Sequence, residues 1–319
     1  MAKFSIPLSV PKSQRGNYLN NFQVATQGSG RLFLFAGDQK VEHLNDDFYG
    51  KNISLEDASP EHLFKIAARV PGAILATHIG LLAKYGQDYK NLPFILKING
   101  KSPLSGTKDT LYSGAWLNGG EILRFHKQSG LKIIGLGYTV YLGSEQEAQM
   151  LKEAAEMVQN AHQSGMLAII WMYPRNSQIK NEDDVHLIAG GAGVAACLGA
   201  DFVKVKYPYK EAATDAKASA FKEVAAAAGK TGVICVGGAQ QKAEDLLRHL
   251  SRQIKNGSSG LAVGRNMHQR SLEEAVSLGK AIVAILHKNA GLNEALAILK
   301  NKKTDSRLKR KKAKLLGVF

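Results

Sequence analysis

The sequence predicts a closed (β/α)8 barrel, in which parallel strands alternate with helices. Eight short runs rich in Val, Ile, Leu and Phe recur along the chain, and amphipathic helical stretches separate most of them. Alternation of strand and helix requires parallel crossover connections, and the span of residues 31–290 suits a closed barrel better than an open sheet. The strands are predicted at residues 31–38, 73–79, 94–100, 133–143, 167–174, 202–208, 232–238 and 261–266.

Helix start signals support the helices between these strands. Ser59 and Pro60 place a capping residue and a first-turn proline before the stretch EHLFKIAARV. A Ser followed three residues later by Glu is typical of a capping box. Two such boxes are predicted, from Ser144 with Glu147 and from Ser271 with Glu274.

We expect one barrel domain over residues 31–300, preceded by an N-terminal extension at 1–30 and followed by a basic tail at 301–319. Two connections, 39–58 and 101–118, are longer than ordinary barrel loops. Both follow the carboxyl ends of strands, where barrel enzymes place their active sites. Each is therefore a candidate lid or binding loop, with a plain insertion as the alternative.

The chain is strongly basic, and its charge is uneven. Lys and Arg number 42 against 27 Asp and Glu, a net charge of +15. The tail holds eight cations and a single acid, Asp305, so that +8 remains for residues 1–301. The body thus suits anionic substrates, and we favour a solvated tail over one that binds nucleic acid. The tail cations are Lys302, Lys303, Arg307, Lys309, Arg310, Lys311, Lys312 and Lys314.

Two cysteines, Cys197 and Cys235, lie in apolar surroundings without the spacing of a metal site. This pattern predicts neither a disulfide framework nor a zinc site of the cysteine type, and it fits a reducing cytoplasm. The N-terminus has no continuous apolar run of a secretory signal, and no window approaches 18 apolar residues. We therefore expect a cytoplasmic protein with no membrane association.

The strand predicted at 202–208 carries two lysines that alternation places inside the barrel. Phe202, Lys204 and Lys206 share one face, whereas the opposite face carries Val203, Val205 and Tyr207. A buried lysine beside another cation loses its proton readily, and its free amine can attack a carbonyl to form a Schiff base. The alternative is that both lysines pair with carboxylates near the strand end and merely hold phosphate.

Other polar residues follow the strands at the same rim. Trp171 and Tyr173 share one face of their strand, a Tyr hydroxyl there can move a proton, and Arg175 can clamp an anion. Asp38 ends the first strand and can serve as a general base. The last two strands end in glycines that let backbone amides approach a phosphate, namely Gly237, Gly238 and Gly264, the last followed by Arg265.

Six segments together resemble the archaeal-type class I fructose-bisphosphate aldolases, within the deoxyribose-phosphate aldolase-like barrel superfamily. The resemblance runs from about residue 30 to 290. In many members a His-Gly pair follows the aspartate of the first strand, where this sequence has Gln39 and Lys40. The segments are GDQKVEH (37–43), TVYLGSEQEAQML (139–151), WMYPR (171–175), GADFVKVKY (199–207), VGGAQQKAEDLL (236–247) and GLAVGRNMHQR (260–270).

The resemblance implies a metal-free, cofactor-free aldolase of a phosphorylated sugar that forms a homo-oligomer. It assigns the Schiff base to Lys204, its tuning to Lys206, proton transfer to Tyr173 and deprotonation of the substrate hydroxyl to Asp38. The expected reaction is reversible cleavage of fructose 1,6-bisphosphate to dihydroxyacetone phosphate and glyceraldehyde 3-phosphate. Relatives also act on other phosphorylated ketones, as transaldolase-like or acyl-transferring thiolase enzymes. Substrate and phosphate contacts fall on Trp171, Arg175, Lys206, Gly237, Gly238, Gly264 and Arg265.

Three rival interpretations remain. A metal-dependent aldolase or hydrolase would use the cluster Asp38, Glu42, His43, Asp46 and Asp47, whose spacing matches no recognisable metal-ligand motif. A nicotinamide dehydrogenase would use the GxGxxA at 191–196 with Glu211, but too few residues remain for a crossover helix, so we expect one small-residue helix there. The third is a non-catalytic barrel that binds RNA or a partner through its tail.

Overall fold

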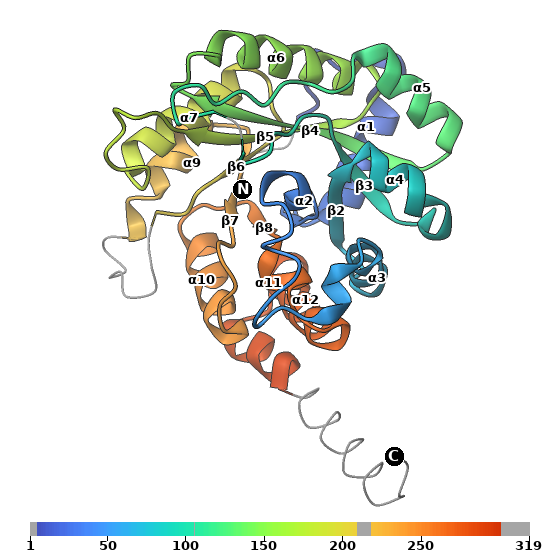
Figure 1. Cartoon of the computed structure of the whole chain (residues 1–319), viewed down its shortest axis with the longest axis vertical. Helices are drawn as coiled ribbons and strands as arrows, with labels where there is room; N and C mark the ends of the chain where they lie inside the picture. The colour runs from blue at the N-terminus through green and yellow to red at the C-terminus, as the bar shows by residue number, and fades with distance from the viewer. Residues whose placement is uncertain (1–4, 105, 209–217, 301–319) are drawn as a thin grey trace, which may run out of the picture.

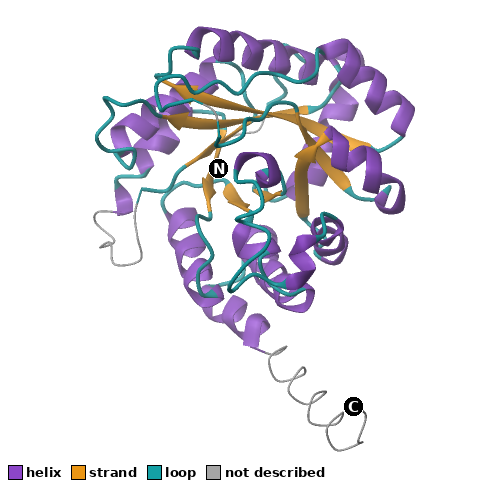
Figure 2. Cartoon of the chain, in the orientation of Figure 1, coloured by secondary structure: helices purple, strands orange, loops and turns teal. Residues whose placement is uncertain are grey.

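The computed structural model describes residues 5–104, 106–208 and 218–300. Eight parallel strands close into a barrel in sequence order, and helices surround them (Figures 1 and 2). This confirms the predicted (β/α)8 barrel and all eight strands. Their bounds are β1 Leu32–Ala36, β2 Ala73–His78, β3 Pro93–Lys97, β4 Lys132–Leu142, β5 Leu167–Pro174, β6 Phe202–Val205, β7 Gly232–Val236 and β8 Gly260–Val263.

The helices follow the strands in alternation, with short extra turns in several loops. The α-helices are α1 Arg15–Thr26, α2 Gln39–Glu42, α3 Glu61–Arg69, α4 Ile79–Tyr85, α5 Gly119–Ser129, α6 Glu147–Gln163, α7 Val185–Cys197, α9 Lys222–Ala228, α10 Ala243–Lys255, α11 Arg265–His268 and α12 Leu272–Lys288. Among the residues that the structure describes, three 3-10 helices are η1 Lys12–Gln14, η2 Leu55–Ala58 and η3 Gly86–Tyr89.

The strands pack two separate apolar layers, as alternation requires. One layer lies between the strands and the surrounding helices and includes Val203 and Val205. The other fills the barrel interior and includes Phe202. The predicted facing of strand β6 is therefore confirmed as far as Val205.

Residues of the predicted N-terminal extension close the end of the barrel opposite the strands' carboxyl ends. Val10, Tyr18 and Ala25 belong to the same buried cluster as the barrel interior. The hydroxyl of Tyr18 donates to the carboxylate of Asp201, which also accepts from the backbone N–H of Ala168 at 2.7 Å. The division into extension, barrel and tail stays a prediction, because the tail at 301–319 lies outside the described residues.

The predicted caps have mixed outcomes. Ser271 and Glu274 form the expected capping box at α12. The box predicted at Ser144 is wrong, because α6 begins later: the Glu147 carboxylate instead accepts from the backbone N–H of Gly143. At α3 the prediction is wrong by one residue, because the helix begins at Glu61 and Pro60 is its N-cap; the Ser59 hydroxyl still accepts from the N–H of Glu61 at 3.3 Å.

The two long loops are fastened to the body at several points. In loop 39–58, the Asp57 carboxylate accepts from the Nδ1–H of His268 at 2.7 Å, and both side chains are fully buried. In loop 101–118, the Glu153 carboxylate of α6 accepts from the Tyr112 hydroxyl and the Ala115 N–H, each at 2.7 Å. The second half of that loop is therefore held against α6.

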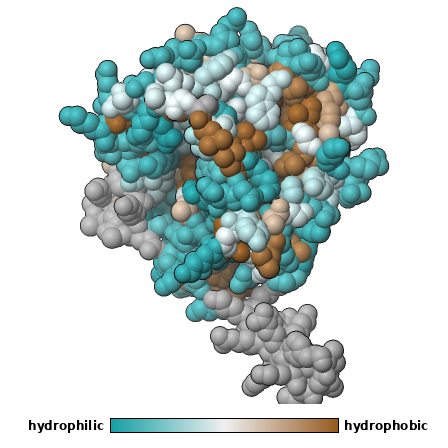
Figure 3. All heavy atoms as spheres, in the orientation of Figure 1, coloured by the Kyte–Doolittle hydropathy of each residue, from teal (hydrophilic) through white to brown (hydrophobic). Residues whose placement is uncertain are grey.

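Within the part of the chain that the structure describes, no helix has the length and apolar character needed to cross a membrane. The face seen in Figure 3 is largely hydrophilic, with apolar residues in small patches. The large apolar side chains with at least a third of their surface exposed are Leu8, Leu19, Tyr49, Leu55, Leu104, Tyr112, Trp116 and Leu123.

Barrel closure depends on one glycine at the start of β8. Gly260 pairs with Leu32 and has a φ of 145°. A Cβ atom there would lie 2.0 Å from the Leu32 carbonyl oxygen, too close for any real contact. We therefore expect Gly260→Ala to lower the free energy of unfolding by ~3 kcal/mol or more, measured by denaturant titration.

Gly16→Ala is the matched control, because nothing lies within 4 Å of the added Cβ. Gly16 is in α1, where alanine is the better helix former and stabilises by up to about 1 kcal/mol. Equal stability of the two variants would contradict the role assigned to Gly260.

Candidate functional site

The barrel mouth gathers charged and polar side chains from several strands. Asp38, at the end of β1, and Lys204, in β6, are 2% and 5% exposed. Lys204 lies in the interior face with Phe202, as predicted. Its Nζ lies 5.2 Å from the centre of the Trp171 ring on the neighbouring strand β5. The structure thus brings three of the predicted site residues together.

Lys206 does not lie inside the barrel, so that placement was wrong. Strand β6 ends at Val205, and the alternation of faces no longer applies beyond it. The side chain of Lys206 is 47% exposed, and its Nζ pairs with Asp183 at 2.7 Å. The two lysines predicted to sit side by side on one strand are therefore in different environments.

A second buried lysine, missed in the sequence, comes instead from β3. Lys97 is 1% exposed, and its Nζ donates to the backbone oxygen of Asn99 at 2.7 Å and to its Oδ1 at 2.9 Å. The Glu42 carboxylate lies 3.7 Å away as a counter-ion. Alternation along β3 could have found this residue, because Ile95 is in the interior layer two positions earlier.

Trp171 lies within reach of both lysines. Its ring centre is 5.4 Å from the Nζ of Lys97 and 5.2 Å from that of Lys204, so both amines face aromatic π density. The indole needs a glycine beside it: a Cβ on Gly137 of β4 would lie 2.4 Å from the ring. The buried Nε1–H of Trp171 has no hydrogen-bond partner among the described residues, which leaves a donor for a ligand.

The pKa values of two carboxyl groups at the mouth, Asp38 and Glu42, are shifted in opposite directions. Burial raises the pKa of Asp38, but the positive charges of Lys204 and Lys97 outweigh this effect, and the net pKa is lowered. Burial and repulsion by Asp38 raise the pKa of Glu42 above its usual value, against the attraction of Lys97.

Burial lowers the pKa of both lysines, Lys97 and Lys204, against the attraction of the two carboxylates. Burial and the nearby lysine also lower the pKa of His78 to about 4. His78 is therefore neutral near pH 7, and its Nε2–H donates to the Asn99 carbonyl oxygen at 3.1 Å. The nearest histidine thus adds no charge to the site.

Tyr173 lies at the end of β5, partly buried, with its ring stacked at 6.2 Å on that of Tyr141. Burial and the two carboxylates raise the pKa of its hydroxyl, so it stays protonated. Arg175, two residues on, is held by the Glu182 carboxylate at 3.0 Å. Both predicted residues therefore lie at the carboxyl end of β5, on the rim of the barrel.

The loops after β7 and β8 lie side by side, as a phosphate site built from both would require. The Asn266 side chain donates to the carbonyl oxygens of Gly237 at 3.0 Å and Ala239 at 2.9 Å. Arg265 begins α11, and its Nε lies 3.7 Å from the Asp47 carboxylate. A phosphate role for these residues stays a prediction.

The rival interpretations find little support in the geometry. The glycines at 191–196 lie inside α7, which confirms the small-residue helix, and Glu211 lies outside the described residues. In loop 39–58, His43 bonds to Asp47 while Glu42 faces Lys97. Across residues 5–104, 106–208 and 218–300, no three His, Cys, Asp or Glu side chains converge in a metal-binding arrangement.

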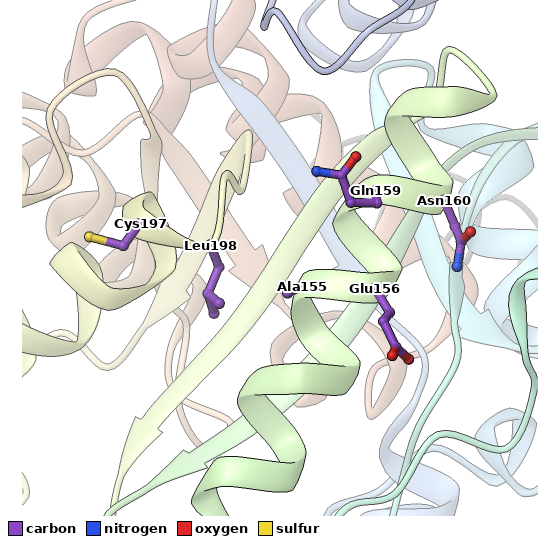
Figure 4. Close-up of a pocket in the computed structure, with 6 residues that line it drawn as sticks. All are labelled: Ala155, Glu156, Gln159, Asn160, Cys197 and Leu198. Atoms are coloured by element: carbon purple, nitrogen blue, oxygen red, sulfur yellow. The ribbon is translucent and has the colours of Figure 1, made fainter.

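A surface hollow outside the barrel mouth lacks the cluster of charged side chains found at the mouth. It lies between α6 and the end of α7, in the layer of helices around the barrel, and Figure 4 shows its side chains. Only one of them carries a charge. The residues are Ala155, Glu156, Gln159, Asn160, Cys197 and Leu198.

Comparison with known proteins decides the family. The profile described as "DeoC/LacD family aldolase" matches residues 32–270. The chain belongs to this family. It is 49% identical over 294 residues to the fructose-bisphosphate aldolase/6-deoxy-5-ketofructose 1-phosphate synthase of Methanocaldococcus jannaschii, covering 92% of this chain and 93% of that protein.

Two solved structures are similar to this chain in fold as well as in sequence. A fructose-bisphosphate aldolase from Slackia heliotrinireducens has a TM-score of 0.89 and 46% identity, with 94% of this chain and 95% of that chain covered. An archaeal fructose-1,6-bisphosphate aldolase, with its catalytic Lys covalently bound to the carbinolamine intermediate, has a TM-score of 0.72 and 27% identity. Here 85% of this chain and 99% of that chain are covered. The resemblance inferred from the sequence segments is thereby confirmed.

The two buried lysines of this aldolase should differ in their effect on stability. Lys97→Met removes two hydrogen bonds to Asn99 and leaves the buried Glu42 carboxylate without its ion-pair partner, and we expect it to cost about 3 kcal/mol of unfolding free energy. Lys204→Met breaks no hydrogen bond or ion pair found among the described residues, and we expect a loss of about 1 kcal/mol or less. Denaturant unfolding at pH 7 measures the stability of both variants. Equal losses would contradict the difference in bonding between Lys97 and Lys204.

Proposed function

We propose that this chain is a class I aldolase that reversibly cleaves fructose 1,6-bisphosphate into dihydroxyacetone phosphate and glyceraldehyde 3-phosphate through a Schiff base on Lys204. The names of its relatives at 49% and 46% identity support this reaction. The carbinolamine intermediate bound covalently to the catalytic lysine of a structural neighbour supports the Schiff-base class. The same machinery acting on another phosphorylated ketone is the alternative.

The observation that carries the proposal is the difference between the two buried amines. The Nζ of Lys97 donates to two oxygens of Asn99 and lies 3.7 Å from the Glu42 carboxylate. The Nζ of Lys204 has no hydrogen bond or ion pair among the described residues, although Asp38 and Glu42 act on it through their charges. A nucleophilic amine needs a free electron pair, so Lys204 is the better candidate.

The proposed chemistry begins when the neutral Lys204 amine attacks the C2 carbonyl. The resulting carbinolamine loses its hydroxyl as water, with Tyr173 supplying the proton, and a protonated iminium forms. Asp38, whose pKa is lowered, then accepts the proton of the C4 hydroxyl. The C3–C4 bond breaks, its electron pair flows into the iminium, and the aldehyde leaves. Protonation of the enamine at C3 and hydrolysis release the second product.

The rim residues would hold the two phosphates. Backbone amides at Gly238 and Gly264 and the Arg265 guanidinium lie at the adjacent ends of β7 and β8, where barrels often bind phosphate. The N–H of Gly237 donates to the Ala262 carbonyl oxygen at 2.8 Å, so Gly237 would line this site without donating to a phosphate. Arg175 is the proposed second clamp, and Trp171 lines the cavity. Lys206 is displaced to the surface by its pair with Asp183, so it would act only at the outer edge of the mouth.

The reaction would place the protein in central carbohydrate metabolism, in glycolysis or gluconeogenesis, in the cytoplasm. We also propose a homo-oligomer, in keeping with the family resemblance. The protonated iminium serves as the electron sink, so the proposed mechanism requires no metal or cofactor.

Reductive trapping tests the Schiff base. The whole chain is incubated with fructose 1,6-bisphosphate or dihydroxyacetone phosphate and borohydride, and its peptides are mapped by mass spectrometry. We expect a reduced adduct on Lys204 and loss of cleavage by at least about a thousandfold in Lys204→Met, because nothing replaces the nucleophile.

Tyr173→Phe serves as the companion variant, since it keeps the ring and removes only the hydroxyl. It should still form some adduct but turn over roughly a hundredfold more slowly. An adduct on Lys206 or Lys97 would overturn the assignment of the nucleophile, and no adduct with any ketose phosphate would refute the Schiff-base mechanism.

Deletion of residues 302–319 separates the aldolase from a barrel that acts through its basic tail. We expect cleavage to be retained, because every proposed catalytic residue lies before residue 302. Steady-state kinetics of the truncated and full chains, at low and moderate salt, measure the effect. Activity that disappeared with the tail would argue strongly against the barrel as the complete catalytic unit.

A further inference from the structure

At the rim of the barrel, Glu182 lies between two cations from different parts of the chain. Glu182 belongs to the loop between β5 and α7. One of its carboxylate oxygens accepts from the Nε and Nη2 of Arg175 at 3.2 and 3.0 Å, and the other accepts from the Nζ of Lys108 at 3.0 Å. The proposed mechanism gives Arg175 a phosphate to bind, but it has no task for Glu182 or Lys108.

The Glu182 side chain is an anion at neutral pH. Burial raises its pKa, but the hydrogen bonds and positive charges of Lys108 and Arg175 outweigh this effect, and the net pKa is lowered. The side chain is 19% exposed, so the carboxylate lies within the rim and not in open water. It therefore gives the two cations the opposite charge that a phosphate group would give them.

The next residue of the same loop repeats this arrangement. Asp183 pairs with the Nζ of Lys206 at 2.7 Å. Arg175, Glu182 and Lys206 also line one small cavity together with Tyr173, the proposed proton donor. The loop after β5 thus holds an acid against both Arg175 and Lys206.

The space beside Arg175 is too small for a phosphate group while Glu182 stays in place. The cavity that they line has a volume of about 20 Å³, which is room for roughly one water molecule. A phosphate group is far larger than a water molecule. A phosphate that binds Arg175 through this cavity therefore has to move the Glu182 carboxylate aside.

The ion pairs of Glu182 can be exchanged for others. The side chains of Arg175 and Lys108 are 38% and 58% exposed, and ion pairs with such exposure contribute little to stability. A phosphate group carries a charge of about −1.5 to −2 near pH 7, and arginine pairs with two of its oxygens at once. A phosphate is therefore a stronger ligand than a carboxylate for the same two cations.

The loops that carry these cations do not depend on Glu182 to stay together. In loop 101–118, the Asp109 carboxylate accepts from the N–H of Ser177 at 2.7 Å. The backbone oxygen of Asp109 accepts from the N–H of Glu145 at 2.8 Å. Movement of the Glu182 carboxylate would thus release the two cations while the loops stay joined.

We propose that Glu182 is a specificity-determining residue, which occupies Arg175 and Lys108 in the free protein and yields them to the second phosphate of a ketose bisphosphate. The inference rests on the proposed function and deepens it. Displacement of the carboxylate opposes binding of the second phosphate, so the effect falls on bisphosphates and spares monophosphates. Glu182 thereby narrows the difference in affinity between the two classes of substrate.

The test variant is Glu182→Gln, which keeps the size of the side chain and removes its charge. We expect the KM for fructose 1,6-bisphosphate to fall about fivefold, because the second phosphate no longer competes with a carboxylate. The KM for fructose 1-phosphate, which has no second phosphate, should be unchanged. Steady-state kinetics of the full chain with both substrates measure this, and the gain should shrink as the salt concentration rises.

The matched control is Glu156→Gln, which removes one acid from α6 at a position where the side chain is 61% exposed. Both KM values should be unchanged in this control. A higher KM for the bisphosphate in Glu182→Gln would mean that Glu182 holds Arg175 in place for the phosphate, and it would overturn the proposal. Equal changes for the two substrates, or no change for either, would also overturn it.

Binding without catalysis separates this inference from the proposed function. In the Lys204→Met background, titration calorimetry with fructose 1,6-bisphosphate measures affinity alone, and Glu182→Gln should again tighten binding about fivefold. This result in a chain whose wild type cleaves no ketose phosphate would support the inference and refute the proposed function. Cleavage by the wild type, with equal affinity in the two variants, would refute the inference alone. Absence of binding and of cleavage would refute both.

Discussion

Inside the barrel, two lysines and two carboxylates face one another with little access to water. Each charge can be kept there only if an opposite charge or a hydrogen bond compensates its lost hydration. Lys97 meets this requirement through Asn99 and Glu42, and Asp38 meets it through the surrounding cations. Lys204 meets it least well, and the proposed nucleophile is thus the group whose charge the interior supports least.

Much of the fold could be predicted because it depends on local periodicity. Apolar runs located all eight strands, and alternation placed Phe202 and Lys204 inside while Val203 and Val205 face the helices. The same rule failed at Lys206, since it holds only while the strand continues, and nothing in the apolar pattern marks where β6 ends. The capping box predicted at Ser144 is also wrong. The Glu147 carboxylate accepts from the N–H of Gly143 and not from that of Ser144.

The site itself was only partly predictable, because its environment comes from residues far apart in the chain. Alternation along β3 would have revealed Lys97, but not that its partner is Glu42 in α2. Loop 39–58, which carries Glu42, is held by the buried pair of Asp57 with His268 and by the stacking of Phe48 on that histidine at 4.6 Å. No sequence pattern connects positions more than two hundred residues apart.

The N-terminal segment gives the barrel a single entrance. Val10, Tyr18 and Ala25 fill the end away from the active site, and Phe22 stacks on Phe202 at 6.0 Å. Substrate and both products therefore use the same mouth. In the proposed reaction one half of the sugar stays covalently attached to the deeper lysine, so the aldehyde has to depart before water can release the other half. With the other end of the barrel closed, the two products of the proposed reaction leave one after the other through the same mouth.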